Sequence, residues 1–103
     1  MENFVKSLFE GWRRDRSSLS IAASLGSVRV FAFCTVAGVT DDTVALSLGT
    51  NKLDLIDFSF DGWNLLLTPA VPDAVDFRGN KIEASLSGLR DGMELSIFLL
   101  AKS

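Results

Sequence analysis

The stretch that decides the fold is Val28–Ala37, which reads VRVFAFCTVA. Successive side chains of a strand point to opposite faces of its sheet, so the stretch divides into two alternate sets. Both sets are mostly apolar: they are Val28, Val30, Ala32, Cys34 and Val36 on one face and Arg29, Phe31, Phe33, Thr35 and Ala37 on the other. We therefore predict a central strand that is buried on both faces, with other elements covering it above and below.

Upstream of this strand, residues 2–16 have the spacing of an amphipathic helix. Large apolar side chains recur at positions that share one helical stripe, and basic residues near the end suit the helix dipole. The stripe comprises Phe4, Val5, Leu8, Phe9 and Trp12. Such a stripe needs a docking surface, and we expect this surface to be the Phe31/Phe33 side of the central strand.

The rest of the chain reads as short strands joined by turns. Leu19–Leu25 alternates apolar with small residues, and Gly26-Ser27 is typical of a type II′ hairpin turn into the central strand. Gly38 suggests a bulge or a close approach of the backbone, and a bulge or sharp bend near Leu55–Ile56 would bring two apolar sets to one core. Further strands are expected at 44–48, 53–60, 63–67, 82–86 and 93–100.

This order of elements predicts a mainly β fold. We expect a small antiparallel curled sheet or barrel of six to seven short strands, preceded by one N-terminal amphipathic helix. In size and element order it resembles the Sm-like and SH3-like small barrels, most closely over Val36–Leu48. With 103 residues the chain is expected to form a single domain, with the helix at 2–16 and a β-rich body at 19–100.

The composition is apolar for so short a chain. Hydrophobic residues make up 48% of it, and the mean hydropathy is +0.29. Because a small domain has much surface for its volume, part of this apolar content stays at the surface unless another chain covers it. We therefore expect a homo-oligomer or a protein partner.

Sequence features also bear on location. No uncharged stretch approaches the ~20 residues of a membrane helix, so we expect no membrane span. Charged residues interrupt the N-terminal segment, which lacks the continuous apolar core of a signal peptide. Together with the single cysteine, this favours the reducing environment of the cytoplasm.

The net charge of −3 is unevenly distributed. Residues 1–30 carry five basic and three acidic side chains, whereas residues 31–103 carry five basic and ten acidic ones. An acidic body repels a phosphate backbone, so binding of nucleic acid by the strands is not expected. The segment Trp12–Arg16 is the alternative contact for an anionic lipid, nucleic acid or acidic protein, although a solvated helix end explains it more simply.

The chain contains little that could carry catalysis. It has no histidine and no tyrosine, and one cysteine cannot build a zinc site, so we predict no enzyme, no cofactor and no metal. Cys34 is expected to be a small buried residue. A cluster of carboxylates could suggest Ca²⁺ or Mg²⁺, but its spacing fits solvated turns better. The cluster comprises Asp41, Asp42, Asp54, Asp57 and Asp61.

The function expected from these patterns is that of a non-enzymatic interaction module that binds itself or a partner through apolar surface. One alternative is a binding domain for a small ligand or nucleotide effector, and a second is weak nucleic-acid binding through the N-terminal arginines. Aromatic residues around Asp61–Gly62 would line the ligand groove, or else belong to the core. The candidate interaction residues are Phe4, Phe9, Trp12, Arg13, Arg14, Arg16, Phe58, Phe60 and Trp63.

Overall fold

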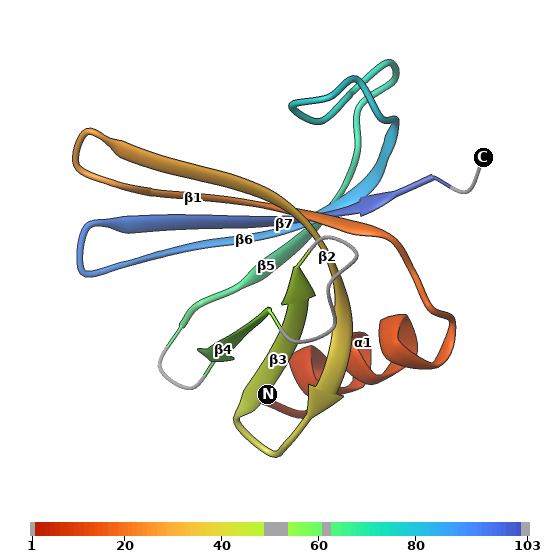
Figure 1. Cartoon of the computed structure of the whole chain (residues 1–103), viewed down its shortest axis with the longest axis vertical. Coiled ribbons are helices and arrows are strands. Elements are labelled where there is room, and N and C mark those ends of the chain that lie inside the picture. The colour runs from red at the N-terminus through yellow and green to blue at the C-terminus, as the bar shows by residue number, and fades with distance from the viewer. Residues whose placement is uncertain (1, 49–53, 61–62, 102–103) are drawn as a thin grey trace. The chain divides into compact units, whose positions relative to one another are not determined.

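The computed structural model describes residues 2–48, 54–60 and 63–101, within which one helix is followed by seven strands (Figure 1). The elements are α1 (Glu2–Arg14), β1 (Leu19–Leu25), β2 (Val28–Val39), β3 (Thr43–Leu48), β4 (Leu55–Ser59), β5 (Leu66–Pro69), β6 (Ile82–Arg90) and β7 (Met93–Leu100). The strands form one antiparallel sheet in the order β4-β3-β2-β1-β7-β6-β5. The mainly β fold with an N-terminal helix is confirmed. In the described residues β4 and β5 are sheet edges, so the sheet is open and the closed-barrel alternative is wrong.

Contacts between residues group the chain into two compact units. The helical unit comprises Met1–Ser17 and Cys34–Gly62, and the hairpin unit comprises Ser18–Phe33 and Trp63–Ser103. Their boundary falls within β2, whose first half belongs to the hairpin unit and whose second half belongs to the helical unit. That the whole chain behaves as one domain stays a prediction.

In the helical unit, α1 is fixed by aromatic packing and by an ion pair with the turn between β2 and β3. The Phe9 ring is fully buried, with its centroid 5.8 Å from that of Phe60. Val36 and Leu46 lie opposite each other on β2 and β3, and both are buried. The helix therefore packs on the Phe60 ring, and the predicted docking surface around Phe31/Phe33 is wrong.

The β2–β3 pair contains the bulge predicted at Gly38. Val36 lies opposite Leu46, but Gly38 lies opposite Ala45, so Ala37 is the extra residue on β2. Hydroxyl and carboxylate groups form hydrogen bonds within the adjoining turn, as Thr and Asp side chains commonly do in turns.

The second predicted bulge, near Leu55–Ile56, is wrong. Ile56 pairs with Leu46 and Phe58 pairs with Val44 without a register shift. Leu55 simply points to the other face of β4, where its side chain is exposed. An exposed leucine on an edge strand breaks the alternation of apolar and polar residues in the same way as a bulge would. Leu53, the other residue of this apolar set, lies outside the described residues.

The hairpin unit is built on the pairing of β1 with β7 and of β7 with β6. Leu19 pairs with Leu99 and Ile21 with Ile97, while Leu86 on β6 also pairs with Ile97. Most of these side chains are buried, so they form the apolar face of this unit. β5 begins at Leu66, three positions after the start predicted from the sequence at Trp63.

Two tight turns close the hairpins of this unit. Gly26 has a φ of 61°, as the first residue of a type II′ turn requires. Asp91 and Gly92 have φ values of 52° and 81°, which is the pattern of a type I′ turn. β6 therefore continues to Arg90, beyond the predicted strand end at Leu86.

The burial of β2 differs from the prediction. Val28, Val30 and Phe31 are half exposed or more, so the first half of the strand is not covered on both faces. In the second half only one face is buried, because Cys34 is buried while its neighbour Thr35 is exposed. A strand with two apolar faces is therefore not a fully buried strand here; part of its apolar content is surface.

Among the described residues, no helix has both the length and the apolar character required to cross a membrane.

Candidate functional site

The aromatic residues predicted on α1 are divided between core and surface. Phe9 and Trp12 are buried, and their rings meet edge to face with centroids 5.5 Å apart. Phe60 is buried beside Phe9, whereas Phe4 is about half exposed. Three of these four side chains thus stabilise the helical unit from inside, and Phe4 is the one that presents apolar surface.

The predicted arginines lie at the solvent-exposed end of α1. Arg13, Arg14 and Arg16 are all exposed, and Arg14 Nε lies 3.8 Å from Asp15 Oδ1. Exposed ion pairs of this kind contribute little to stability. These residues form a small basic end to the helix, next to the buried Trp12.

The third predicted group is divided between the two units. Phe58 and Phe60 belong to the helical unit and Trp63 to the hairpin unit. Phe58 and Trp63 are both half-buried, and the turn Asp61–Gly62 between them lies outside the described residues. The groove predicted around this turn therefore stays a prediction.

The carboxylates near the β2–β3 turn are held by local contacts. Lys6 Nζ lies 2.7 Å from Asp41 Oδ1, and this hydrogen bond raises the pKa of Lys6 and lowers the pKa of Asp41. Thr43 Oγ1 donates to Asp42 at 3.1 Å. Within the described part of the chain, no group of three or more His, Cys, Asp or Glu side chains is placed to hold a metal ion.

Cys34 lies on the buried face of β2 and forms no disulfide. Burial raises the pKa of its thiol to about 12, so the thiol stays protonated at neutral pH. A protonated buried thiol is a weak nucleophile, and Cys34 therefore acts as a small apolar side chain in the core.

An exposed apolar strip, comprising Leu25, Val28 and Val30, extends the apolar face of the hairpin unit. Their exposed fractions are 54%, 62% and 50%. The two-residue turn places Leu25 opposite Val28, and Val30 follows on the same face. Leu25 also pairs with Met93 on β7. Since Leu25 and Ile21 lie four residues apart on one strand, the strip continues the face that is buried further along β1.

A pair of opposite charges lies beside this strip. Arg90 pairs with Met93 across the β6–β7 hairpin, so its side chain leaves the sheet on the strip's face. Arg90 Nε lies 3.6 Å from Asp91 Oδ2 in the adjoining turn. The apolar strip therefore has both a positive and a negative group at its rim.

The opposite face of the hairpin unit is rich in hydroxyl groups. Across β1, β7 and β6, cross-strand pairing aligns Ala22 with Ser96 and Ser96 with Ser87. The next rows pair Ser24 with Glu94 and Ser20 with Phe98. This polar face consists largely of small side chains, which leave room above the strands.

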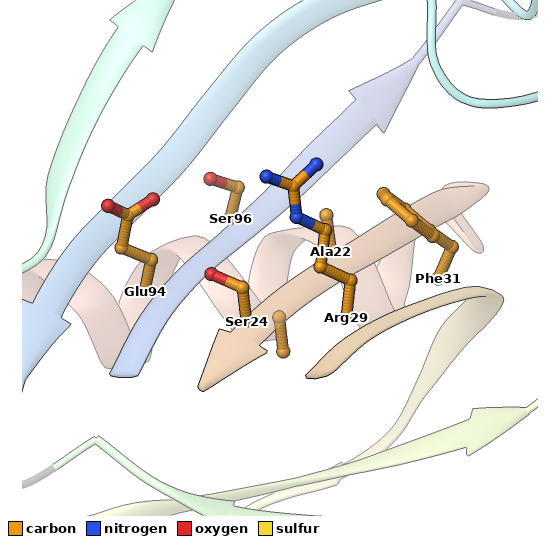
Figure 2. Close-up of a pocket in the computed structure, with 7 residues that line it drawn as sticks. Ala22, Ser24, Arg29, Phe31, Glu94 and Ser96 are labelled. Carbon is orange, nitrogen blue, oxygen red and sulfur yellow. The ribbon is translucent and has the colours of Figure 1, made fainter. Parts of the chain in front are cut away.

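A hollow of about 180 Å³ lies on this polar face, and Figure 2 shows the side chains that line it. The side chains labelled in the figure rise to the same side of the sheet from β1, β2 and β7. The lining comprises Ala22, Ala23, Ser24, Arg29, Phe31, Glu94 and Ser96. The hollow thus combines a guanidinium, a carboxylate, two hydroxyls and one aromatic ring.

An aromatic cluster supports one wall of the hollow. The ring centroids of Phe31 and Phe33 each lie 5.4 Å from that of Phe77. The Arg78 guanidinium carbon lies 4.8 Å from the centre of the Phe33 ring, a cation–π distance. Phe31 is half exposed, so one part of its ring packs and the other faces the hollow.

Asp76 holds the loop that carries this cluster. The backbone N–H groups of Arg78 and Asn80 donate to Asp76 Oδ1 at 2.9 Å and 2.8 Å. Burial raises the pKa of Asp76. The two backbone hydrogen bonds, the Asn80 side-chain amide and the nearby Ser20 hydroxyl together lower this pKa more strongly, so it lies below its usual range. Ser20 Oγ is fully buried, and its approach to Asp76 falls short of hydrogen-bond geometry.

Sequence reasoning missed both surfaces of the hairpin unit. The sequence pattern predicts Val28 and Val30 in a strand buried on both faces and Leu25 in a half-buried strand, and it does not connect Arg29 with Glu94. The alternation of small and apolar residues along Ser20–Leu25 and along Ser85–Ser87 does indicate one polar face. The strand order that brings Arg29 and Glu94 to either side of β1 is not visible in the sequence.

In comparisons with known proteins, no protein-family model, no curated protein and no solved structure matches this chain.

Proposed function

We propose that this protein is a non-enzymatic interaction module that forms a homodimer through the apolar strip. The observation that carries the proposal is the exposure of Leu25, Val28 and Val30 next to one another at the end of an otherwise buried face. Contiguous apolar surface costs free energy in water, about 25 cal/mol per Å². A surface of this kind commonly marks a protein interface.

The charges at the rim favour a second copy as the occupant. In a two-fold dimer the same patch appears on both sides, so a contact between one group of the first copy and a different group of the second copy occurs twice, once in each direction. With Arg90 and Asp91 side by side, rotation about a two-fold axis can set the arginine of one copy against the aspartate of the other. The patch is therefore complementary to itself in both apolar character and charge.

A reducing, cytoplasmic location is part of the same proposal. It is supported by Cys34, which is the single cysteine of the chain and a free, buried thiol.

The first test is the molar mass of the purified chain, measured by light scattering after size exclusion across the micromolar range. We expect the wild-type protein to shift from monomer to dimer as concentration rises. Leu25→Lys and Val28→Lys should stay monomeric, because each places a charge in the strip. The matched control is Leu66→Lys, because Leu66 is 69% exposed but pairs with Ser87 on the polar face.

A charge exchange tests the rim. Arg90→Glu alone should weaken the dimer, since it sets two negative groups against each other, and adding Asp91→Lys should restore it. A wild-type protein that stays monomeric throughout overturns the proposal. So does a dimer that Leu66→Lys disrupts as strongly as Val28→Lys.

A further inference from the structure

The hollow on the polar face is built differently from the apolar strip and serves no role in the proposed dimer. Its lining contains an exposed cation, Arg29, and an exposed anion, Glu94. In the described residues neither side chain forms a salt bridge, although both rise to the same side of the sheet (Figure 2). Opposite charges are therefore displayed over one hollow without neutralising each other.

The strand order sets the spacing of these charges. β2 and β7 are the two neighbours of β1, so Arg29 and Glu94 start from strands about 10 Å apart. Ser24 lies between them on β1, directly opposite Glu94. Because the side chains of Arg29 and Glu94 are long, both can reach inward over Ser24, so a small ligand that carries a carboxylate and an ammonium group can meet both of them.

We propose that the hollow binds a small zwitterion, namely a free amino acid or a dipeptide with an apolar side chain. Its carboxylate pairs with the Arg29 guanidinium, which offers paired N–H donors for a carboxylate. Its ammonium group pairs with Glu94, and the hydroxyls of Ser24 and Ser96 supply further hydrogen bonds.

The aromatic wall accounts for the apolar part of the ligand. Phe31 is held from behind by Phe77, which leaves the exposed part of its ring fixed in place over the hollow. A ring fixed before binding loses little conformational entropy when the ligand arrives. The volume of about 180 Å³ is below the ~300 Å³ at which pockets for drug-sized ligands begin, so we expect a small ligand.

The binding test is an NMR titration of ¹⁵N-labelled protein with L-phenylalanine. Two analogues are titrated alongside: 3-phenylpropionate, which lacks the ammonium group, and phenethylamine, which lacks the carboxylate. We expect saturable shifts of the amides of Ala22, Ser24 and Ser96 with L-phenylalanine. Both analogues should bind at least about tenfold more weakly, because each leaves one charged partner unmatched.

Variants test which side chain binds each charged group of the ligand. Arg29→Gln should bind L-phenylalanine no better than wild type binds phenethylamine, and Glu94→Gln no better than wild type binds 3-phenylpropionate. The matched controls are Arg13→Gln and Glu83→Gln, which change exposed charges outside the hollow and should leave binding unchanged. Amide spectra of all four variants report whether the fold is retained.

Three results would overturn the proposal. They are the absence of saturable shifts with L-phenylalanine, equal affinity for the zwitterion and its two analogues, and unchanged binding in both hollow variants. The molar mass is also measured with and without L-phenylalanine. Because the hollow and the strip lie on opposite faces of the strands, ligand binding should leave the monomer–dimer equilibrium unchanged, and the two proposals can fail independently.

Discussion

Asp76 is a single carboxylate that organises the loop between β5 and β6. Besides the two N–H groups at Oδ1, its Oδ2 accepts a hydrogen bond from the Asn80 side-chain amide at 3.2 Å. One side chain thus accepts the hydrogen bonds from backbone N–H groups that backbone carbonyls would accept in a helix or strand. Phe77 and Arg78, which support the wall of the hollow, follow directly in the chain.

Replacing Asp76 tests this role and its dependence on pH. Asp76→Ala should lower the free energy of unfolding by about 1–2 kcal/mol, because two part-buried N–H groups lose their acceptor. Asp76→Asn keeps an oxygen acceptor and should cost less. The folded-state pKa is lowered, so the carboxylate's contribution is present above the unfolded pKa near 4 and is lost as pH falls through the lower folded value.

Urea unfolding of wild type and Asp76→Asn between about pH 6 and pH 2 measures this dependence. The stability difference between the two should shrink toward the acid end. The control is Asp57→Asn, at an exposed site on β4, which should change stability by no more than about 0.5 kcal/mol. A difference that stays constant with pH would contradict the role given to the charge.

At the scale of elements, α1 ends in a Schellman motif with an unusual residue. Ser17 N–H donates to the Trp12 carbonyl at 2.9 Å and Arg16 N–H to the Arg13 carbonyl at 3.2 Å. Arg16 has a φ of 53°, in the left-handed region where helices usually place glycine. This turn explains why α1 stops at Arg14, two residues before the end predicted from the apolar stripe.

The motif predicts opposite effects for one substitution at two nearby sites. Arg16→Gly should raise the free energy of unfolding by about 0.5–1 kcal/mol, because it relieves the left-handed strain of a residue with a side chain. Arg13→Gly, inside the last helical turn, should lower it by about 1 kcal/mol. Both remove one exposed arginine, so charge is matched. Chemical denaturation followed by circular dichroism measures both, and equal signs would refute the assignment.

Local patterns predicted most elements because their determinants are local. The stripe ending at Trp12, the alternation along Leu19–Leu25 and the bulge at Gly38 each follow from residues within one element. The wrong predictions concern the burial of an element by other segments. Val28 and Val30 have the composition of core residues, yet their exposure depends on which segments lie above them, and this is set by strands distant in sequence.

At the scale of the whole molecule, the candidate surfaces depend on strand order. β1 lies between β2 and β7, and this arrangement sets Arg29 and Glu94 on either side of Ser24. The sequence predicts an interaction through apolar surface on α1 and on strands with two apolar faces, but Phe9 and Trp12 of α1 are buried. The presence of exposed apolar side chains was thus predictable from composition, whereas their location required the pairing of β1 with β7.

The proposed dimer also predicts a property of thermal unfolding. If unfolding separates the two copies, each tenfold rise in protein concentration stabilises the folded dimer by about 1.4 kcal/mol. Tm of the wild-type protein should therefore increase by several degrees per tenfold concentration in differential scanning calorimetry. Tm of Val28→Lys should not change with concentration. A wild-type Tm that is equally independent of concentration would contradict coupled dissociation.

The pairing of Leu19 with Leu99 has a consequence for the nascent chain. While the ribosome synthesises the segments in between, β1 has β2 as a neighbour, but the N–H and C=O groups of its other edge await a strand not yet made. The helical unit is in a different position, because its last described strand, β4, ends at Ser59. Synthesis thus imposes an order: α1 and its strands can assemble early, and the centre of the hairpin unit closes late, with an open strand edge exposed to chaperones or to other nascent chains in the meantime.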